Sequence, residues 1–481
     1  MPAGSPRREA LALGALLVLA AAVRFVGIGS QGLWLDEVVT AQLIRNPFGD
    51  MLSLIPDSES TPYLYYVLLW PWAKLFGYGE PAIRSLSAVI GIATVAAVWA
   101  GARELVSRRA ALAAAALAAL NPFLVWYSQE ARAYALLALL CAVSFWLFAR
   151  ALRLGDGRSL AWWALASALA LATHYFAAFT IVPEAIALAL LAGRTRAWAL
   201  ACAAIGLAAL ALAPLAAQQR RGGGADWIGD ISLAHRISEI PKRFAAGEFG
   251  NQLGYVFWPL CVIAVGALAL LLLRAGADER RGGLVALGVG LAGLIVPIAL
   301  ALATLDYVFP RNLIGSLPLL LVAAGAALTT DRARWGGAAL LTGALALSVL
   351  ALVRIGTDDG LQRDDVRSAA AYLDKQRAAA IVVSPANDAR TLSYYLGRFF
   401  TLVDPGVGTR DIAVLELTRA PVGERKAPRT VPGFRVADVE DTDTYRLVLL
   451  RAPSPVMVGP ALAAQAAARP EDAALVADLT R

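Results

Sequence analysis

Charged residues are scarce in this sequence. Of its 481 residues only 16% are Asp, Glu, Lys or Arg, whereas about a quarter are charged in an average soluble domain. This deficit excludes an ordinary soluble globular protein. The net charge of +7 does not indicate nucleic-acid binding, because the basic residues form short clusters between apolar runs. Such clusters are typical of the cytoplasmic loops of membrane proteins.

Cysteine and histidine are also rare. The three cysteines, Cys141, Cys202 and Cys261, all fall inside apolar runs, so we expect them to be small packing residues. No disulfide framework and no metal-binding motif can be recognised. A nucleotide-binding fingerprint is absent too, and the run Gly222-Gly-Gly224 is followed by no phosphate-binding motif. The sequence therefore predicts no metal-binding motif, and a divalent cation at the paired carboxylates Asp36 and Glu37 is the one alternative.

Long apolar runs, by contrast, recur from residue 10 to residue 353. Several approach the ~20 residues that cross a bilayer, and an arginine cluster marks each internal turn. Arg7 and Arg8 place the N-terminus in the cytoplasm. The run at 10–28 is long and lacks a convincing cleavage site, so we interpret it as a retained helix. We predict an α-helical polytopic protein of the inner or plasma membrane with about eleven spans: 10–28, 82–102, 110–126, 131–150, two short spans within 159–193, 197–217, 255–273, 282–304, 312–329 and 335–353.

Two regions fall outside this pattern. The segment 62–79 is rich in Tyr and Trp and contains Pro71 and Lys74, so we expect it to lie in the membrane interface. From about residue 356 the composition becomes polar, with short apolar runs at 380–383 and 445–450. We predict a membrane domain over 1–355 and a small extracytoplasmic α/β domain over 356–481.

The first candidate site is the acidic pair Asp36 and Glu37, which follows the first apolar run at the external face. A carboxylate there can remove a proton from a hydroxyl, bind a cation, or simply be solvated. The neighbouring Trp34 and the external placement favour a functional role for the pair, such as that of a general base.

Four further residues are predicted at the same face. Glu130 and Arg132 open the next external turn, where they form either an ion pair or a binding site in which Arg132 contacts a phosphate. His174 lies in a turn between two short helices and is either a core residue or part of a polar pocket. Arg311 begins a span after Pro310 and either reaches to lipid headgroups or holds an anionic lipid substrate.

Together these segments resemble a known family. Their order and spacing over about residues 10–330 resemble the polyprenyl-phosphate-sugar-dependent glycosyltransferases of the GT-C fold, such as the protein O-mannosyltransferases and the lipid A aminoarabinose transferase. The segments that carry the resemblance are Trp34-Leu-Asp-Glu37, Thr61-Pro62 with Tyr63 and Tyr65, Leu75-Phe-Gly77 with Arg84, Tyr127-Ser-Gln-Glu-Ala-Arg132, and Pro310-Arg311.

The resemblance implies a membrane enzyme that moves a sugar from a polyprenyl-phosphate donor to an acceptor glycan, lipid or protein on the extracytoplasmic face. Asp36 resembles the base that activates the acceptor, and the anomeric carbon inverts. Because Thr61 stands where many relatives carry a cation or histidine, phosphate binding is assigned to Arg132 and Arg311. An alternative is a transporter or flippase of a lipid-linked glycan, which would place its charges at mid-membrane. A non-catalytic scaffold is a third possibility.

Overall fold

The fold was analysed in a computed structural model, which describes residues 6–303, 306–376, 378, 380–398, 400–402 and 406–478. The chain divides into two compact units. The first, here the helical unit, comprises Met1–Ile28 and Leu43–Val353. The second, here the sheet unit, comprises Gly29–Gln42 and Arg354–Arg481. Residues 29–42, which contain the acidic pair, thus group with the C-terminal part of the chain.

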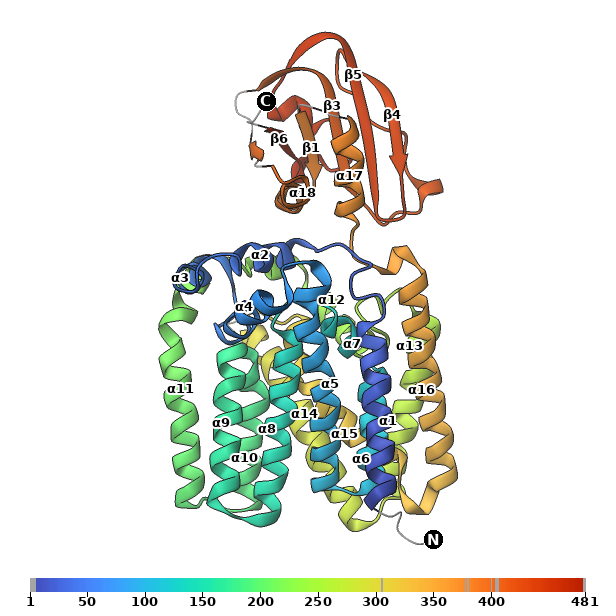
Figure 1. The fold of residues 1–481 in the computed structure, drawn as a ribbon. Coiled ribbons are helices and arrows are strands. Elements are labelled where there is room, and N and C mark those ends of the chain that lie inside the picture. The colour runs from blue at the N-terminus through green and yellow to red at the C-terminus, as the bar shows by residue number, and fades with distance from the viewer. Residues whose placement is uncertain are drawn as a thin grey trace. The chain divides into compact units, whose positions relative to one another are not determined.

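The helical unit is a bundle of long apolar helices that run side by side (Figure 1). Their bounds are α1 (Pro6–Phe25), α5 (Glu80–Leu105), α6 (Arg108–Leu120), α7 (Pro122–Ser128), α8 (Tyr134–Leu154), α9 (Gly157–Thr173), α10 (Ala178–Leu191), α11 (Arg196–Arg221), α13 (Gly254–Leu273), α14 (Ala277–Ala303), α15 (Leu317–Leu328) and α16 (Arg334–Thr357). Shorter helices lie across one end of this bundle: α3 (Phe48–Ser58), α4 (Leu64–Phe76) and α12 (Leu233–Ala246).

Helices occur in all eleven predicted ranges, and the membrane-embedded helical fold is confirmed. Among the described residues, seven helices are long and apolar enough to cross a membrane, or up to eight if a bent pair counts as one span. The count of eleven is therefore not confirmed. The helix α1 carries charges near both ends, and α9 and α10 have only 17 and 14 residues. The segment around 62–79 forms α4, whose 13 residues are fewer than a span requires.

The predicted span 110–126 is broken rather than continuous. The helices α6 and α7 meet at Asn121 with a bend of 58°. Pro122 has no N–H to donate and begins the second helix. The Asn121 side chain caps it by accepting from the Leu124 N–H at 2.9 Å, and donates to the Phe244 carbonyl oxygen at 2.8 Å. The bend delivers Tyr127 and the following turn to the end of the bundle that carries α12.

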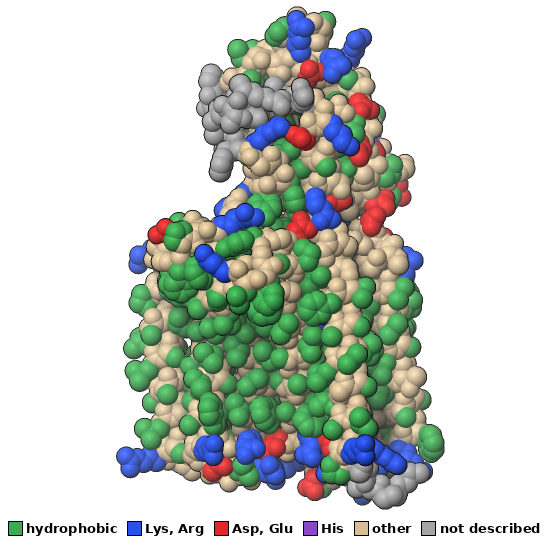
Figure 2. Space-filling model, viewed as in Figure 1, with side chains coloured by type: hydrophobic (Ala, Val, Ile, Leu, Met, Phe, Trp, Pro, Cys, Tyr) green, Lys and Arg blue, Asp and Glu red, His purple; other side chains and the backbone are tan. Residues whose placement is uncertain are grey.

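The opposite end of the bundle gathers charges. Glu9 pairs with Arg103 at 2.6 Å and Arg108 at 3.2 Å, and Arg153 pairs with Glu104 at 2.7 Å. In the space-filling view, blue and red side chains form a rim below a broad green surface (Figure 2). An apolar belt bounded by charged side chains is typical of a protein in a bilayer.

Close helix contacts use small residues. A Cβ atom on Gly325 of α15 would lie 2.6 Å from the Ala110 carbonyl oxygen of α6. Such an approach is possible only for glycine, and small residues at crossings are what allows helices to pack closely in lipid. Both helices also contribute to one apolar cluster with α13 and α16.

The sheet unit contains a six-stranded sheet in the order β2-β6-β1-β3-β5-β4. The central strands β1 and β3 are parallel, and the other neighbouring strands in the sheet are antiparallel. Two helices, α17 (Val366–Gln376) and α18 (Ala389–Leu396), and the short α19 (Pro460–Ala464) accompany it. The strands are β1 (Ala380–Ser384), β2 (Phe400–Leu402), β3 (Val407–Leu417), β4 (Arg435–Asp441), β5 (Tyr445–Val458) and β6 (Ala474–Asp478).

Alternation along the strands fills both faces of this sheet. Ile381 and Val383 of β1 face the core with α17 and α18, whereas Ala380 and Val382 face the core with α19. Every residue of β1 is buried, as expected for a strand covered on both faces. The predicted small α/β domain is therefore confirmed, and its two apolar runs at 380–383 and 445–450 lie in β1 and β5.

Candidate active site

Arg311 lies in an aromatic surround. It follows Pro310 in the short 3₁₀ helix Pro310–Ser316, which leads into α15. Its guanidinium lies over the rings of Tyr134, Trp227 and Phe309, at 5.5, 5.4 and 5.4 Å from their centroids. Such contacts attract a cation to the face of each ring. Since Arg311 is only half-buried, its positive charge can act on an anionic ligand.

Arg132 has a different environment, because it pairs with a buried carboxylate. Its Nη1 atom donates to Glu59 and lies 2.8 Å from both carboxylate oxygens. Both side chains are buried. Glu59 comes from the end of α3 and is a partner that the sequence did not predict. Much of the charge of Arg132 is therefore already compensated.

His174 caps the turn between α9 and α10. Its Nδ1 atom accepts a hydrogen bond from the Phe176 N–H at 3.2 Å, so the neutral ring carries its proton on Nε2. Burial, together with the positive charges of Arg132 and Arg311, lowers the pKa of His174 from 6.5 to about 3. The imidazole is therefore neutral at physiological pH, and it can donate a hydrogen bond but supplies no charge.

Glu130 lies in a second set of polar contacts. Its carboxylate and Arg311 are both within electrostatic range of Tyr127. The Tyr127 hydroxyl donates to Glu248 at 2.8 Å, and Glu248 in turn pairs with Arg243 of α12. The structure thus brings the four predicted residues of the helical unit together at one end of the bundle: Glu130, Arg132, His174 and Arg311. We call them the polar cluster.

Asp36 and Glu37 belong to the sheet unit. They lie in the first turn of α2 (Leu35–Leu43), where the helix dipole favours negative charge. Glu37 is fully buried, with its Oε2 atom 3.8 Å from Nε of Arg363, whereas Asp36 is partly exposed. The two acids are thus not an equivalent solvated loop pair, because a helix begins at this point and turns Glu37 inward.

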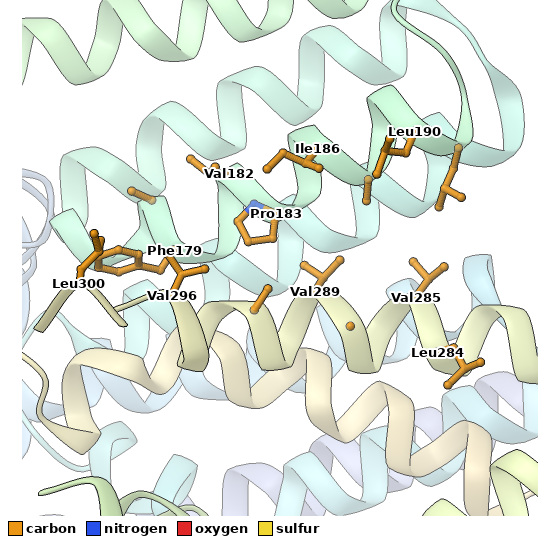
Figure 3. Close-up of a pocket in the computed structure, with 15 residues that line it drawn as sticks. Phe179, Val182, Pro183, Ile186, Leu190, Leu284, Val285, Val289, Val296 and Leu300 are labelled. Carbon is orange, nitrogen blue, oxygen red and sulfur yellow. The ribbon is translucent and has the colours of Figure 1, made fainter. Parts of the chain in front are cut away.

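An apolar groove runs between α10 and α14, with a cavity volume of about 590 Å³. Side chains of the two helices face one another across it, including Pro183 and Ile186 on one side and Val289 and Val296 on the other (Figure 3). Every lining residue is apolar or glycine. At one end Phe179 stacks edge-on with Phe176 at 5.1 Å, and Phe176 packs on His174 at 5.7 Å. The groove therefore reaches the polar cluster through two aromatic rings.

Several buried polar residues were not predicted. Arg24 in α1 is fully buried and donates to Ser128 and to the carbonyl oxygens of Ala118 and Ala119. Arg236 of α12 pairs with Asp306 at 2.5 Å. Their partners lie far away in the chain, so no local pattern signals them. Arg24 holds α1 against α6 and α7, and Arg236 holds α12 against Asp306. Neither arginine belongs to the polar cluster.

Among the residues that the structure describes, no group of three or more His, Cys, Asp or Glu side chains could hold a metal ion. Of the acidic pair, Glu37 has the guanidinium of Arg363 beside it.

Comparison with known proteins identifies the fold. Residues 60–218 match the model of a family described as dolichyl-phosphate-mannose-protein mannosyltransferase. Two crystal structures of ArnT from Cupriavidus metallidurans, one bound to undecaprenyl phosphate and one in the apo state, superpose with TM-scores of 0.55 and 0.56. They are 13% and 12% identical, and each comparison covers 90% of this chain and 97% of the other. The fold is that of a GT-C glycosyltransferase.

A further match extends this GT-C fold to a more distant protein. The apo oligosaccharyltransferase of Archaeoglobus fulgidus superposes with a TM-score of 0.51 and 12% identity, over 81% of this chain and 64% of that one. No curated protein matches the sequence. The resemblance inferred from the motifs is confirmed: part of the chain matches a mannosyltransferase family model, and the fold is that of the GT-C glycosyltransferases.

Proposed function

We propose that this protein is a glycosyltransferase that moves a sugar from a polyprenyl-phosphate donor to an acceptor on the extracytoplasmic face of the cell membrane, with inversion at the anomeric carbon. The acceptor is a glycan, a lipid or a protein. The observation that carries the proposal is the combination of a polar cluster that contains Arg311 with an all-apolar groove that ends beside it. A polyprenyl phosphate has the same two parts, a branched hydrocarbon chain and an anionic head. The ArnT structure of the same fold holds such a lipid, undecaprenyl phosphate.

The donor head is assigned mainly to Arg311. Its charge is held by aromatic rings and it is partly exposed, whereas Arg132 is buried against Glu59. The neutral His174 can donate a hydrogen bond from Nε2, and Glu130 can accept one from a sugar hydroxyl. The polyprenyl chain would occupy the groove, where burying its hydrocarbon against fifteen apolar or glycine residues supplies the hydrophobic part of the binding energy.

The proposed reaction is a single displacement. Asp36 takes the proton from the acceptor hydroxyl, and the acceptor oxygen then attacks the anomeric carbon from the face opposite the phosphate. The bond between the anomeric carbon and the phosphate oxygen breaks, and the lipid phosphate leaves with its negative charge stabilised by Arg311. Glu37, paired with Arg363, would support Asp36 rather than react.

The orientation belongs to the proposal as well. The N-terminus and the arginine-rich rim would be cytoplasmic, since positive loops remain inside. The polar cluster lies at the opposite end of the bundle, and with the sheet unit it would be extracytoplasmic.

Transfer of a labelled sugar by the purified full-length protein tests this function. The parent protein is incubated with a labelled polyprenyl-phosphate sugar and a membrane extract, and the products are separated. Asp36→Asn keeps the shape of the side chain but loses its basicity, so the rate should fall roughly 10²- to 10⁴-fold. Donor binding, measured separately, should survive. Transfer at the parent rate by the Asp36→Asn protein would refute the assignment of Asp36 as the general base. A parent protein that labels no product would refute the proposed donor class.

A further inference from the structure

The segment that carries the acidic pair is tied along its whole length to the C-terminal domain. We call residues 29–42 the acidic segment. The contacts that hold it lie within the sheet unit, which contains both the segment and residues 354–481. The partners are four side chains of the C-terminal domain, Arg363, Arg367, Arg390 and Tyr395, separated from the segment by 326 to 362 positions in the chain.

Tyr395 and Arg367 hold the residues before the acids. The Leu33 N–H donates to the Tyr395 hydroxyl at 2.5 Å. Arg367 donates to the carbonyl oxygens of Gly29 and Ser30 at 3.3 and 2.5 Å. The approach is close enough that a Cβ atom on Gly32 would lie 3.1 Å from the Tyr395 hydroxyl oxygen. These bonds fix the backbone immediately before α2 begins.

Arg363 and Arg390 hold other residues of the acidic segment, which are Gln31, Glu37 and Gln42. Arg363 donates to the Gln31 side chain from its backbone N–H and from Nη1, at 3.0 and 3.2 Å, and its Nε faces Glu37. Arg390 donates twice to Gln42 at the other end of α2, at 2.9 and 2.7 Å. The partly exposed Asp36 is therefore bracketed by contacts on both sides.

These side chains stand on a rigid support. Arg390 and Tyr395 belong to α18, whose Leu392 is fully buried in the core between the sheet and α17. Tyr395 itself packs against the same core. The position of α2 is consequently fixed by contacts to a helix that packs on the sheet.

Resting on the proposed function, we propose that the C-terminal domain positions the catalytic base, with Tyr395, Arg363 and Arg390 as positioning residues that act through the acidic segment. A general base must stand within hydrogen-bond reach of the proton it removes, and a displacement of ~1 Å can cost about 10²-fold in rate. The domain is thus part of the catalytic machinery without touching the reacting atoms.

The test compares two tyrosines of the sheet unit in the full-length protein. Tyr395→Phe removes the hydroxyl that accepts from Leu33. Tyr372→Phe is the matched control, because Tyr372 packs on the same core but its hydroxyl donates to Asp438. We expect kcat to fall roughly tenfold to a hundredfold in Tyr395→Phe, with donor affinity unchanged, and to stay at the parent value in Tyr372→Phe.

Two readouts separate positioning from general destabilisation. In an Asp36→Asn background, Tyr395→Phe should lower the residual rate by less than about twofold, because two changes that act through one group are not additive. Hydrogen exchange of the amides of residues 29–42 should accelerate in Tyr395→Phe and not in Tyr372→Phe, while β1 and β3 keep their protection.

The outcomes also distinguish this proposal from the proposed function. If the parent protein transfers sugar but Tyr395→Phe matches Tyr372→Phe in kcat and in exchange of the acidic segment, positioning by the domain is refuted and the function stands. If the parent protein transfers nothing, the function fails and this proposal fails with it. Faster exchange of the acidic segment in Tyr395→Phe without any loss of kcat would likewise refute positioning. The contacts would then hold the segment without affecting catalysis.

Discussion

The two arginines of the polar cluster carry the same charge but lie in different surroundings. Arg311 is held by three aromatic rings and is partly exposed. Arg132 is buried and paired with the buried Glu59. The same substitution should therefore affect binding at one position and folding at the other.

For Arg311→Ala we expect a loss of donor affinity with the fold intact. Removing a charged contact to phosphate costs about 1.5–3 kcal/mol, which is roughly ten- to a hundredfold in Kd. Binding of a polyprenyl-phosphate lipid to the purified variant measures it. An unchanged Kd would move the phosphate site away from Arg311.

For Arg132→Ala we expect lower stability, because the change removes the positive charge that faces the buried Glu59 carboxylate. Breaking a buried pair in this way costs about 3–5 kcal/mol, which thermal unfolding in detergent would detect. The matched control is the double variant Glu59→Gln with Arg132→Gln, which removes both charges and should recover part of the loss. Normal stability of Arg132→Ala would show that Glu59 finds another partner.

Asp388 makes the stability of the sheet unit depend on pH. Burial, and secondly the nearby Asp364, raise the pKa of Asp388 from 3.8 to about 7. A carboxyl with a raised pKa is protonated more readily in the folded state. It therefore disfavours folding progressively as the pH rises from about 4 to about 7.

We therefore expect Asp388→Asn to leave stability unchanged near pH 4 and to raise it at pH 8 by about 1–2 kcal/mol, discounted for partial exposure. Hydrogen exchange of β1 amides measures this, with variant and parent compared at each pH so that intrinsic exchange rates cancel. Equal protection of the two proteins at pH 8 would contradict the raised pKa.

For single residues, the sequence identified candidate site residues but not the side chains with which they pair. Glu130, Arg132, His174 and Arg311 could be grouped because each lies at the end of an apolar run that reaches the same side of the membrane. Glu59 could not be assigned to Arg132, since the two are 73 positions apart and share no local pattern. Whether a cation is compensated or available depends on that partner.

At the scale of elements, the facing surfaces of α10 and α14 are the feature to test. Gly288 lines the groove, and a Cβ atom there would meet nothing within 4 Å. Gly288→Phe should therefore fill the groove without disturbing the helices. We expect it to weaken binding of a long-chain polyprenyl donor roughly tenfold, and that of a short-chain analogue less, because the loss scales with the hydrocarbon excluded.

Gly206→Phe in α11 is the matched control, since that position is equally open but lies outside the groove. Equal donor affinities for the two variants would place the polyprenyl chain elsewhere.

Element boundaries were less predictable than element existence. The apolar run at 110–126 predicted one helix, but Asn121 and Pro122 end one helix and begin another at 58°. The signal was present, because proline at a first helical position after asparagine is a common start. It was outweighed by the apolar residues on both sides of Asn121.

At the scale of the whole molecule, the ion pairs that join Glu9, Arg103 and Arg153 to neighbouring helices gather the arginine clusters at one end of the bundle. If that end is cytoplasmic, a cysteine at Ala277 should be labelled only from the cytoplasm, and one at Ser238 only from outside. Both positions are exposed, and the native cysteines are first replaced. Labelling of position 238 from the cytoplasm would overturn the orientation.

The helical fold and the small α/β domain could be predicted because apolar runs and a shift in composition persist over many residues. The membership of residues 29–42 in the sheet unit could not. It depends on a few side chains, among them Arg363 and Tyr395, which carry no apolar periodicity and lie more than three hundred positions away.

That separation has a consequence for the timing of synthesis. The Leu33 N–H and the Tyr395 hydroxyl are 362 positions apart, and a ribosome adds about 5–20 residues per second. The acidic segment therefore emerges roughly 20–70 s before the residue that holds it. During that interval the membrane helices can insert while the proposed base has no fixed place. A chain truncated before α18 would consequently be complete in its membrane bundle and its polar cluster, yet lack an ordered base.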